Sequence, residues 1–318
     1  MTAIIHNSGQ TLCHDRHGRP LPCRGSGQDG EFRPGRPWPA PRFELSADGA
    51  VALDRLTGLH WSADADPAGF PLSRAEAGNL AAEWRAEARH GFDDWRLPDR
   101  RELLSLVDFG SATPSLPPSH PFRNAVPNWY WSATEAAIQP GYFWYVQFLG
   151  GRMFFGRADE YHLVWPVRGR SESLPNPGPV AGTGRAWPEP RFEVLPGGEA
   201  VLDRLTNLVW ARDADPRGAL PWPLALALPH AANERVLAGR VNWRLPTILE
   251  LESLVDATRH TPALPAAHPF VNVRDTYWSA TNSALDPSWA MCLYLHKGGI
   301  GVGHKPTAGF HAWVVSGK

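Results

Sequence analysis

The sequence predicts an α+β protein that consists of two copies of one domain. Residues 94–98 read Asp-Trp-Arg-Leu-Pro and precede a leucine-rich stretch at 101–108, and a matching pair of segments returns at 242–246 and 250–256. Three further tryptophans recur 147 to 149 residues apart, as Trp61 and Trp210, Trp131 and Trp278, and Trp165 and Trp313. Solenoid repeats have periods of roughly 20–50 residues, so each copy is expected to be a whole domain with its own core.

The chain has 318 residues, which at about 150 residues per domain allows two domains. The predicted parts are a leader rich in Gly, Pro and Arg at 1–37, copy one at 38–170, a linker rich in Pro and Gly at 171–186, and copy two at 187–318. Each copy opens with Trp-Pro-x-Pro-Arg-Phe-Glu, so both boundaries fall at the same point of the repeat.

Charge and hydropathy argue against nucleic-acid binders, membrane-surface binders and membrane-spanning proteins. The formal net charge is −1, whereas nucleic-acid and membrane-surface binders carry a basic excess, so no nucleic-acid partner is expected. No stretch approaches the roughly 20 apolar residues of a membrane span. Residues 1–7 lack a basic start and an apolar run, so no signal peptide is expected in this chain, and the compartment stays unknown on this evidence alone.

Each copy is expected to begin with two strands around a tight turn. Residues 51–61 place Asp, Thr and Gly between apolar residues, and these polar side chains can bond the backbone of a turn. Copy two has Asn207 where copy one has Gly58, and asparagine is the next-best residue for a positive φ.

Two helices follow in each copy. The first is expected at about 72–89, where Ser73 and Glu76 form a capping box, and at about 222–237, where Pro229 predicts a kink or two short pieces.

The second helix has the clearer signal. Asp99 with Glu102, and Thr247 with Glu250, are capping boxes for short helices that each bury a leucine and valine stripe.

The last part of each copy is expected to be antiparallel strands. In copy one these are 142–148, a hairpin turn at Gly150-Gly151, 152–157, and a closing strand within 162–169 that pairs beside the first strands. The predicted architecture of each domain is therefore two helices packed on antiparallel strands.

The tryptophans that recur in both copies are expected to be structural, because an element kept in two diverged halves belongs more often to a core than to a ligand site. Arg96 and Arg244 could bind an anion, although an arginine that ties loop carbonyls together is the more frequent arrangement. The predicted core tryptophans are Trp61, Trp95, Trp131, Trp165, Trp210, Trp243, Trp278 and Trp313.

The combination of Trp-Arg-Leu-Pro, Glu-Leu, Tyr-Trp-Ser-Ala-Thr and a closing Val-Arg-Gly resembles the Lcl C-terminal domain family of bacteria, which is named for a collagen-like adhesin. The resemblance covers about 43–169 and 192–317. It implies a C-type-lectin-like fold, an extracellular or cell-surface location and, from the adhesin, binding of sulfated glycans. Copy two departs from the pattern with Val-Ser-Gly at 315–317.

A ligand site is expected where the copies differ, on the outward strand face of copy one. Aromatic rings can stack on sugars while cations bind hydroxyls or sulfates, and the strand face of copy one combines both kinds of side chain. Copy two has fewer aromatic residues on this face and carries His296, His304 and Lys305. The alternative is that this face packs against another domain or subunit. The predicted ligand-binding residues are Phe143, Tyr145, Gln147, Arg152, Phe155 and Arg157.

Cys13 and Cys23 of the leader allow three arrangements. They can form a disulfide if the protein is exported, remain free thiols in a reducing compartment, or join His14 and His17 around zinc. The zinc set is disfavoured because neighbouring Cys13 and His14 rarely both reach one ion.

No catalytic triad order, phosphate loop or His-Glu-x-x-His run is present, so no enzyme, metal or cofactor is expected. The expected function is recognition or adhesion by binding a glycan or a protein surface. The alternative is a structural or assembly subunit whose aromatic strand faces are interfaces. A homo-oligomer is compatible with either function.

Overall fold

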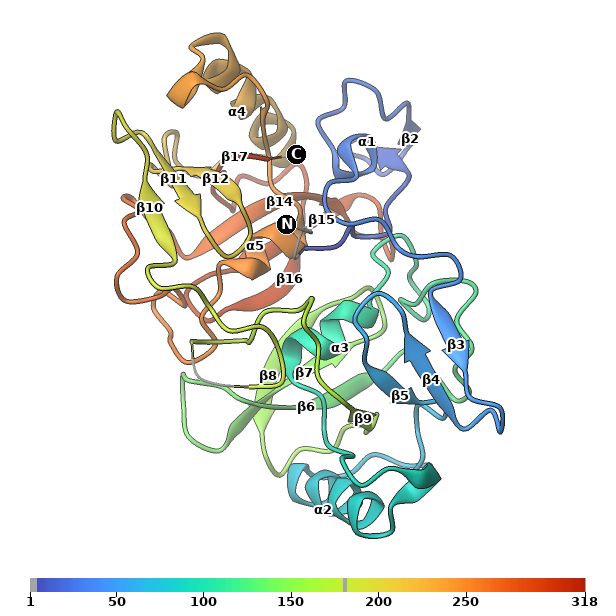
Figure 1. Ribbon diagram of the computed structural model, residues 1–318. Coiled ribbons are helices and arrows are strands. Elements are labelled where there is room, and N and C mark those ends of the chain that lie inside the picture. The colour runs from blue at the N-terminus through green and yellow to red at the C-terminus, as the bar shows by residue number, and fades with distance from the viewer. Residues whose placement is uncertain (1–4, 180–181, 318) are drawn as a thin grey trace. The chain divides into compact units, whose positions relative to one another are not determined.

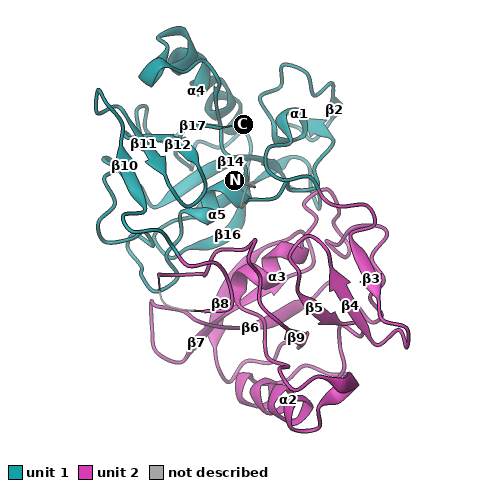
Figure 2. Cartoon of the chain, in the orientation of Figure 1, with its two compact units in different colours: residues 1–37, 187–318 teal, residues 38–186 magenta. Residues whose placement is uncertain are grey.

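The computed structural model describes residues 5–179 and 182–317 (Figure 1). They form two compact units (Figure 2): unit 2 is Trp38–Ala186, and unit 1 combines the chain up to Pro37 with Trp187–Lys318. The leader, expected as a segment of its own, therefore belongs to the unit of copy two. The linker belongs to the unit of copy one, except that its residues 180 and 181 lie outside the described residues.

Unit 2 contains an antiparallel sheet in the order β3-β4-β5-β9. Its strands are β3 (Phe43–Leu45), β4 (Val51–Asp54), β5 (His60–Ser62) and β9 (Val167–Arg168). Trp61 lies opposite Val167, so the closing strand pairs beside the first strands, as the element order predicts. The turn between β4 and β5 also follows the prediction, because the Thr57 hydroxyl donates to Asp54 and Gly58 has a φ of 78°.

A second group of antiparallel strands in unit 2 is β6 (Trp129–Glu135), β7 (Tyr142–Gln147) and β8 (Met153–Arg157). The turn after β7 contains Gly150 and Gly151, whose φ values are 78° and 73°. Glycine adopts such values without steric cost, which is why this hairpin was recognisable from sequence.

Both predicted helices of copy one form at their predicted caps. α2 spans Arg74–Ala86 behind the capping box of Ser73 and Glu76, and α3 spans Arg100–Leu106 behind that of Asp99 and Glu102. A short 3₁₀ turn, η1 (Arg89–Gly91), follows α2.

α3 is buried on every side, where the sequence predicts one apolar stripe. The Arg100 guanidinium lies 3.9 Å from the centre of the Trp144 ring. Arg101 donates to the carbonyl of Asn176, which belongs to the linker. The described part of the linker thus contacts the polar side of α3 within unit 2.

Unit 1 repeats the same element order. Its sheet runs β10-β11-β12-β17-β13, with β10 (Phe192–Val194), β11 (Ala200–Asp203), β12 (Leu208–Ala211), β17 (Val315–Ser316) and β13 (Trp243–Arg244). The other elements of copy two are α4 (Trp222–Glu234), η2 (Leu237–Gly239), α5 (Ile248–Ser253), β14 (Thr276–Asn282), β15 (Trp289–Tyr294) and β16 (Gly299–His304). Trp210 lies opposite Val315, the counterpart of Trp61 opposite Val167, so equivalent strands pair in both copies.

α4 corrects one expectation. Pro229 lies inside a single helix of 13 residues and does not divide it into two pieces. One face of α4 is buried and consists of Trp222, Ala225, Pro229 and Ala232. Packing of this face against the core compensates for the one backbone hydrogen bond that the helix loses at proline. No helix within residues 5–179 and 182–317 is long and apolar enough to cross a membrane.

The recurring tryptophans lie in the cores of their copies. All eight predicted core tryptophans have exposed fractions between 0% and 3%. The indole N–H of Trp165 donates to the Ser62 carbonyl, and that of Trp313 donates to the carbonyl of Ala211. Each buried N–H that finds an acceptor offsets the cost of desolvation.

Trp243→Ala is expected to lower the free energy of unfolding by about 3–5 kcal/mol, the usual cost of deleting a large buried aromatic side chain. Its indole is 3% exposed and donates to the Leu237 carbonyl. Denaturant unfolding of the full chain measures the change. The control Leu224→Ala removes a side chain that is 57% exposed and is expected to change stability by less than about 0.5 kcal/mol. An unchanged unfolding midpoint for Trp243→Ala would contradict the core assignment.

Candidate functional site

The six residues predicted to bind ligand in copy one do not share one face. In the register of β7 and β8, Trp144 lies opposite Phe155 and Tyr142 lies opposite Arg157. Cross-strand partners lie on the same face of a sheet, so Phe155 and Arg157 share the face of Trp144. Phe143, Tyr145, Gln147 and Arg152 lie on the other face, and the predicted aromatic and cationic patch is divided between the two.

The face that carries Tyr145 is also half-buried, whereas the sequence predicts an exposed one. The Arg74 guanidinium of α2 lies 4.6 Å from the Phe143 ring, and the His162 ring lies 4.3 Å from the Tyr145 ring. Gln147 is buried and accepts a hydrogen bond from Arg152. Copy one covers this face with its own helix and closing segment, a contact that periodicity along β7 alone cannot reveal.

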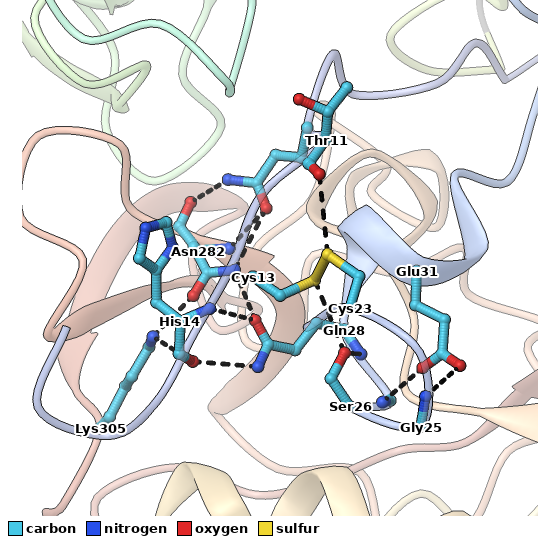
Figure 3. The surroundings of a disulfide bond; sticks show 12 residues. Thr11, Cys13, His14, Cys23, Gly25, Ser26, Gln28, Glu31, Asn282 and Lys305 are labelled. Atoms are coloured by element: carbon cyan, nitrogen blue, oxygen red, sulfur yellow. Dashed lines mark hydrogen bonds between the residues drawn. A yellow bond between two sulfur atoms is a disulfide. The ribbon is translucent and has the colours of Figure 1, made fainter. Parts of the chain in front are cut away.

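In unit 1 the leader docks on copy two through side-chain amides (Figure 3). Gln10 donates to the Asn282 carbonyl and accepts from the Asn282 N–H, which is how a neighbouring strand would pair. Gln28 makes the same pair of bonds with the backbone of His14, and its oxygen also accepts from the Asn282 side chain. These bonds connect two separate parts of the leader, at Gln10 and Gln28, to the end of β14.

Lys305 lies beneath the docked leader. It is fully buried, although the sequence suggests an exposed cation, and burial lowers its pKa to about 7. Its ammonium donates to the side chain of Asn282 and to the carbonyl of His14 (Figure 3). It also donates to the carbonyls of Asp15 and Pro287. Because its acceptors come from both the leader and copy two, Lys305 joins them.

Asp29 of the short helix α1 (Asp29–Phe32) is a second buried contact between the leader and copy two. Its carboxylate accepts from the Thr281 hydroxyl at 2.6 Å. Burial raises the pKa of Asp29 to about 6, and the nearby Glu250 and Arg244, which are paired with each other, act on it in opposite directions.

A disulfide joins Cys13 and Cys23 and closes the loop that carries β1 (Cys13–His14) and β2 (Pro20–Leu21). Both sulfurs are therefore used in the bond, and the zinc arrangement does not form. A Cβ atom added at Gly30 would lie 3.0 Å from one sulfur and 3.2 Å from the other, so α1 packs directly on the disulfide.

A groove of about 830 Å³ lies between this loop and α4, and we call it the leader groove. Arg16, Leu21 and Arg24 contribute to its leader side, and Pro223, Leu226 and His230 to its helix side. Sequence reasoning missed these residues, but two signals were present: the arginines between and beside the cysteines, and the apolar composition of α4 compared with the charged α2.

The leader groove carries uncompensated positive charge. Arg19 pairs with Asp15, and the Glu31 carboxylate accepts from two backbone N–H groups of the loop. Arg16 and Arg24 are exposed and form no ion pair within the described residues, and with Asp15 paired to Arg19 the remaining lining carboxylate, Glu31, can offset only one of them. Opposite charge on a ligand would therefore be attracted to this site.

Two α+β domains of equivalent element order, one of them completed by a disulfide-closed leader, define a duplicated-domain protein. The family model of the Lcl C-terminal domain matches residues 50–168 and 199–316, and the chain belongs to this family. Comparison with curated proteins gives no match, and neither does comparison with solved structures. Within the described ranges, no group of three or more His, Cys, Asp or Glu side chains could hold a metal ion.

Reduction of the disulfide by a dithiol is expected to loosen the leader, because closing a loop of this length contributes about 2–3 kcal/mol. The amide N–H of Asn282 donates to Gln10, so its hydrogen exchange reports leader docking. Exchange is expected to accelerate by roughly 30-fold on reduction. The variant Cys13→Ser/Cys23→Ser should exchange fast with and without the dithiol, and equal slow exchange before and after reduction would refute the role of the disulfide.

Asp29→Asn is expected to remove a pH dependence of stability. The folded-state pKa of Asp29 is raised from 3.8 to about 6, so its contribution to stability is full below about pH 4 and is lost as the pH rises through 6. The variant should match the parent chain near pH 4 and exceed its stability by on the order of 3 kcal/mol at pH 7. Unfolding measured across this range tests it, with the exposed Asp93→Asn as control; a constant difference at all pH values would contradict it.

Proposed function

We propose that the protein is a non-enzymatic recognition protein and that the leader groove is its binding site. The observation that carries the proposal is a groove of about 830 Å³ whose lining includes Arg16 and Arg24, two exposed arginines that form no ion pair among the described residues. Ligand sites have volumes of roughly 300–1,000 Å³ and few, well-placed polar groups.

The ligand is an anion-bearing glycan or protein surface. Arginine forms forked, charge-assisted hydrogen bonds with carboxylate, sulfate and phosphate groups. His17 and His230 also line the groove, and their ring nitrogens can form further hydrogen bonds with a ligand. Both walls belong to one unit, and one of them is covalently closed, so little ordering cost accompanies binding.

The hydrogen bonds of the Ser26 hydroxyl, which lines the groove, support binding without catalysis. Ser26 directs its hydroxyl toward the sulfur of Cys13 and accepts from the Gln28 N–H, so it is not activated by one of the groove's histidines. Nucleophilic catalysis needs such a base within hydrogen-bond reach.

The family resemblance supports two further parts of the proposal: a C-type-lectin-like fold and a location at the cell surface. The disulfide supports an oxidising compartment, because cytosolic thiols are kept reduced.

The second candidate is an assembly subunit, and the exposed apolar side chains of α4 such as Leu224 favour it. Mass measurement in solution distinguishes a self-associating subunit from a monomeric receptor.

Arg16→Gln/Arg24→Gln is expected to weaken binding of polyanions by roughly tenfold, because each lost charge-assisted bond at an exposed site costs about 0.5–1 kcal/mol. The probes are heparin, as a sulfated glycan, and poly-glutamate, as a peptide anion. Added salt should weaken binding to the parent chain.

The control Arg170→Gln/Arg204→Gln makes the same change of charge at exposed residues away from the groove and should leave binding intact. The pair Tyr145→Ala/Arg152→Ala tests the strand face of copy one. If that pair weakens binding and Arg16→Gln/Arg24→Gln does not, the site is on copy one and the leader-groove proposal is wrong.

A further inference from the structure

The helix wall of the leader groove is unusually apolar for a surface helix. Pro223 and Ala227 are exposed in the groove, and Leu226 is half-buried there. At the corresponding positions of α2, copy one has the small residues Ala75, Gly78 and Asn79. The difference is specific to the copy that forms the groove.

The leader wall adds apolar surface of the same kind. Leu21 is half-buried, Pro22 is exposed, and Phe32 is 46% exposed at the end of α1. Aliphatic and proline side chains therefore line the groove on both sides, together with the exposed Arg16 and Arg24.

The aromatic rings of the groove offer little surface for a sugar. Trp222 and Trp243 contribute to its lining but are only 1% and 3% exposed, which leaves Phe32 as the exposed ring among the described lining residues. Sugar recognition relies on ring faces open to solvent, whereas aliphatic walls suit the apolar side chains of a peptide.

We propose that the occupant of the leader groove is an acidic segment of a partner protein, whose aliphatic side chains lie between α4 and the leader while its carboxylates meet Arg16 and Arg24. This inference rests on the proposed function, since it names the ligand class of the same site. Charge complementarity selects an acidic segment, and the aliphatic walls select a protein over a glycan.

Three probes of similar charge test the proposal on the full chain: a 12-residue peptide of alternating leucine and glutamate (a length of about 40 Å when extended), a glutamate-only peptide with the same number of carboxylates, and a heparin oligosaccharide. The leucine-containing peptide is expected to bind roughly tenfold more tightly than the glutamate-only peptide, because it also buries apolar surface. The affinity of each probe is measured by fluorescence anisotropy or calorimetry.

Leu226→Ser should remove this tenfold advantage and leave binding of the glutamate-only peptide unchanged. Leu224→Ser is the matched control, because Leu224 lies on the same helix outside the groove lining. Since Leu226 also packs on the core, Ala227→Asp provides a second variant at an exposed position. It should weaken binding of the leucine-containing peptide by roughly tenfold through charge repulsion, whereas Ala231→Asp, which is exposed on α4 outside this groove, should not.

Three outcomes overturn the inference. If heparin binds most tightly and Leu226→Ser changes nothing, the ligand is a glycan, and the proposed function survives without the protein partner. If the parent chain self-associates through Leu226, the occupant is a second copy. If none of the three probes binds, the proposed function fails, and the inference fails with it.

Discussion

A buried ion pair between the arginine of the Trp-Arg-Leu-Pro segment and the third residue of the following helix holds each copy together. Arg244 donates both of its terminal nitrogens to Glu250, and the same Glu250 carboxylate accepts from the N–H of Thr247 to complete the capping box. One carboxylate thus fixes both the start of α5 and the position of β13. Because both charges are almost fully buried, loss of either partner would leave an unpaired charge inside the protein, which explains why copy one repeats the arrangement with Arg96 and Glu102.

The two copies share this frame but differ in what covers it. The leader presents the amide oxygens of Gln10 and Gln28 to copy two, where Asn282 supplies the donors. Copy one has Glu135 at the position of Asn282 and Ala158 at the position of Lys305. A carboxylate cannot donate a hydrogen bond, and alanine cannot replace the ammonium of Lys305, so the polar contacts direct the leader to copy two.

Features governed by neighbouring residues were predictable from sequence. The capping boxes of α2, α3 and α5 and the glycine turn after β7 require contacts only within a few residues, and the structure forms all of them. Features that depend on distant contacts were not. The strand face of Tyr145 is covered by α2, and the register of the hairpin places Phe155 on the opposite face. The leader docks on copy two through a hydrogen bond between Gln10 and a residue 272 positions away. The candidate site was therefore sought on copy one, because a lone strand pattern contains no information about what packs on it.

The position of the groove suggests why the leader has a disulfide while neither copy needs one. Each copy has a core of tryptophans large enough to stabilise its own fold, whereas the leader is a short segment held by polar contacts, with little apolar core of its own. Its loop nevertheless places Arg16 and Leu21 in the lining of the groove, opposite α4. Closing the loop at Cys13 and Cys23 reduces the entropy that the open leader would otherwise gain. Protonation of Asp29 acts in the same direction, because a neutral carboxyl group is less costly to bury than a carboxylate. Oxidation of the cysteines and protonation of Asp29 would thus both favour the arrangement in which the leader and α4 enclose the leader groove.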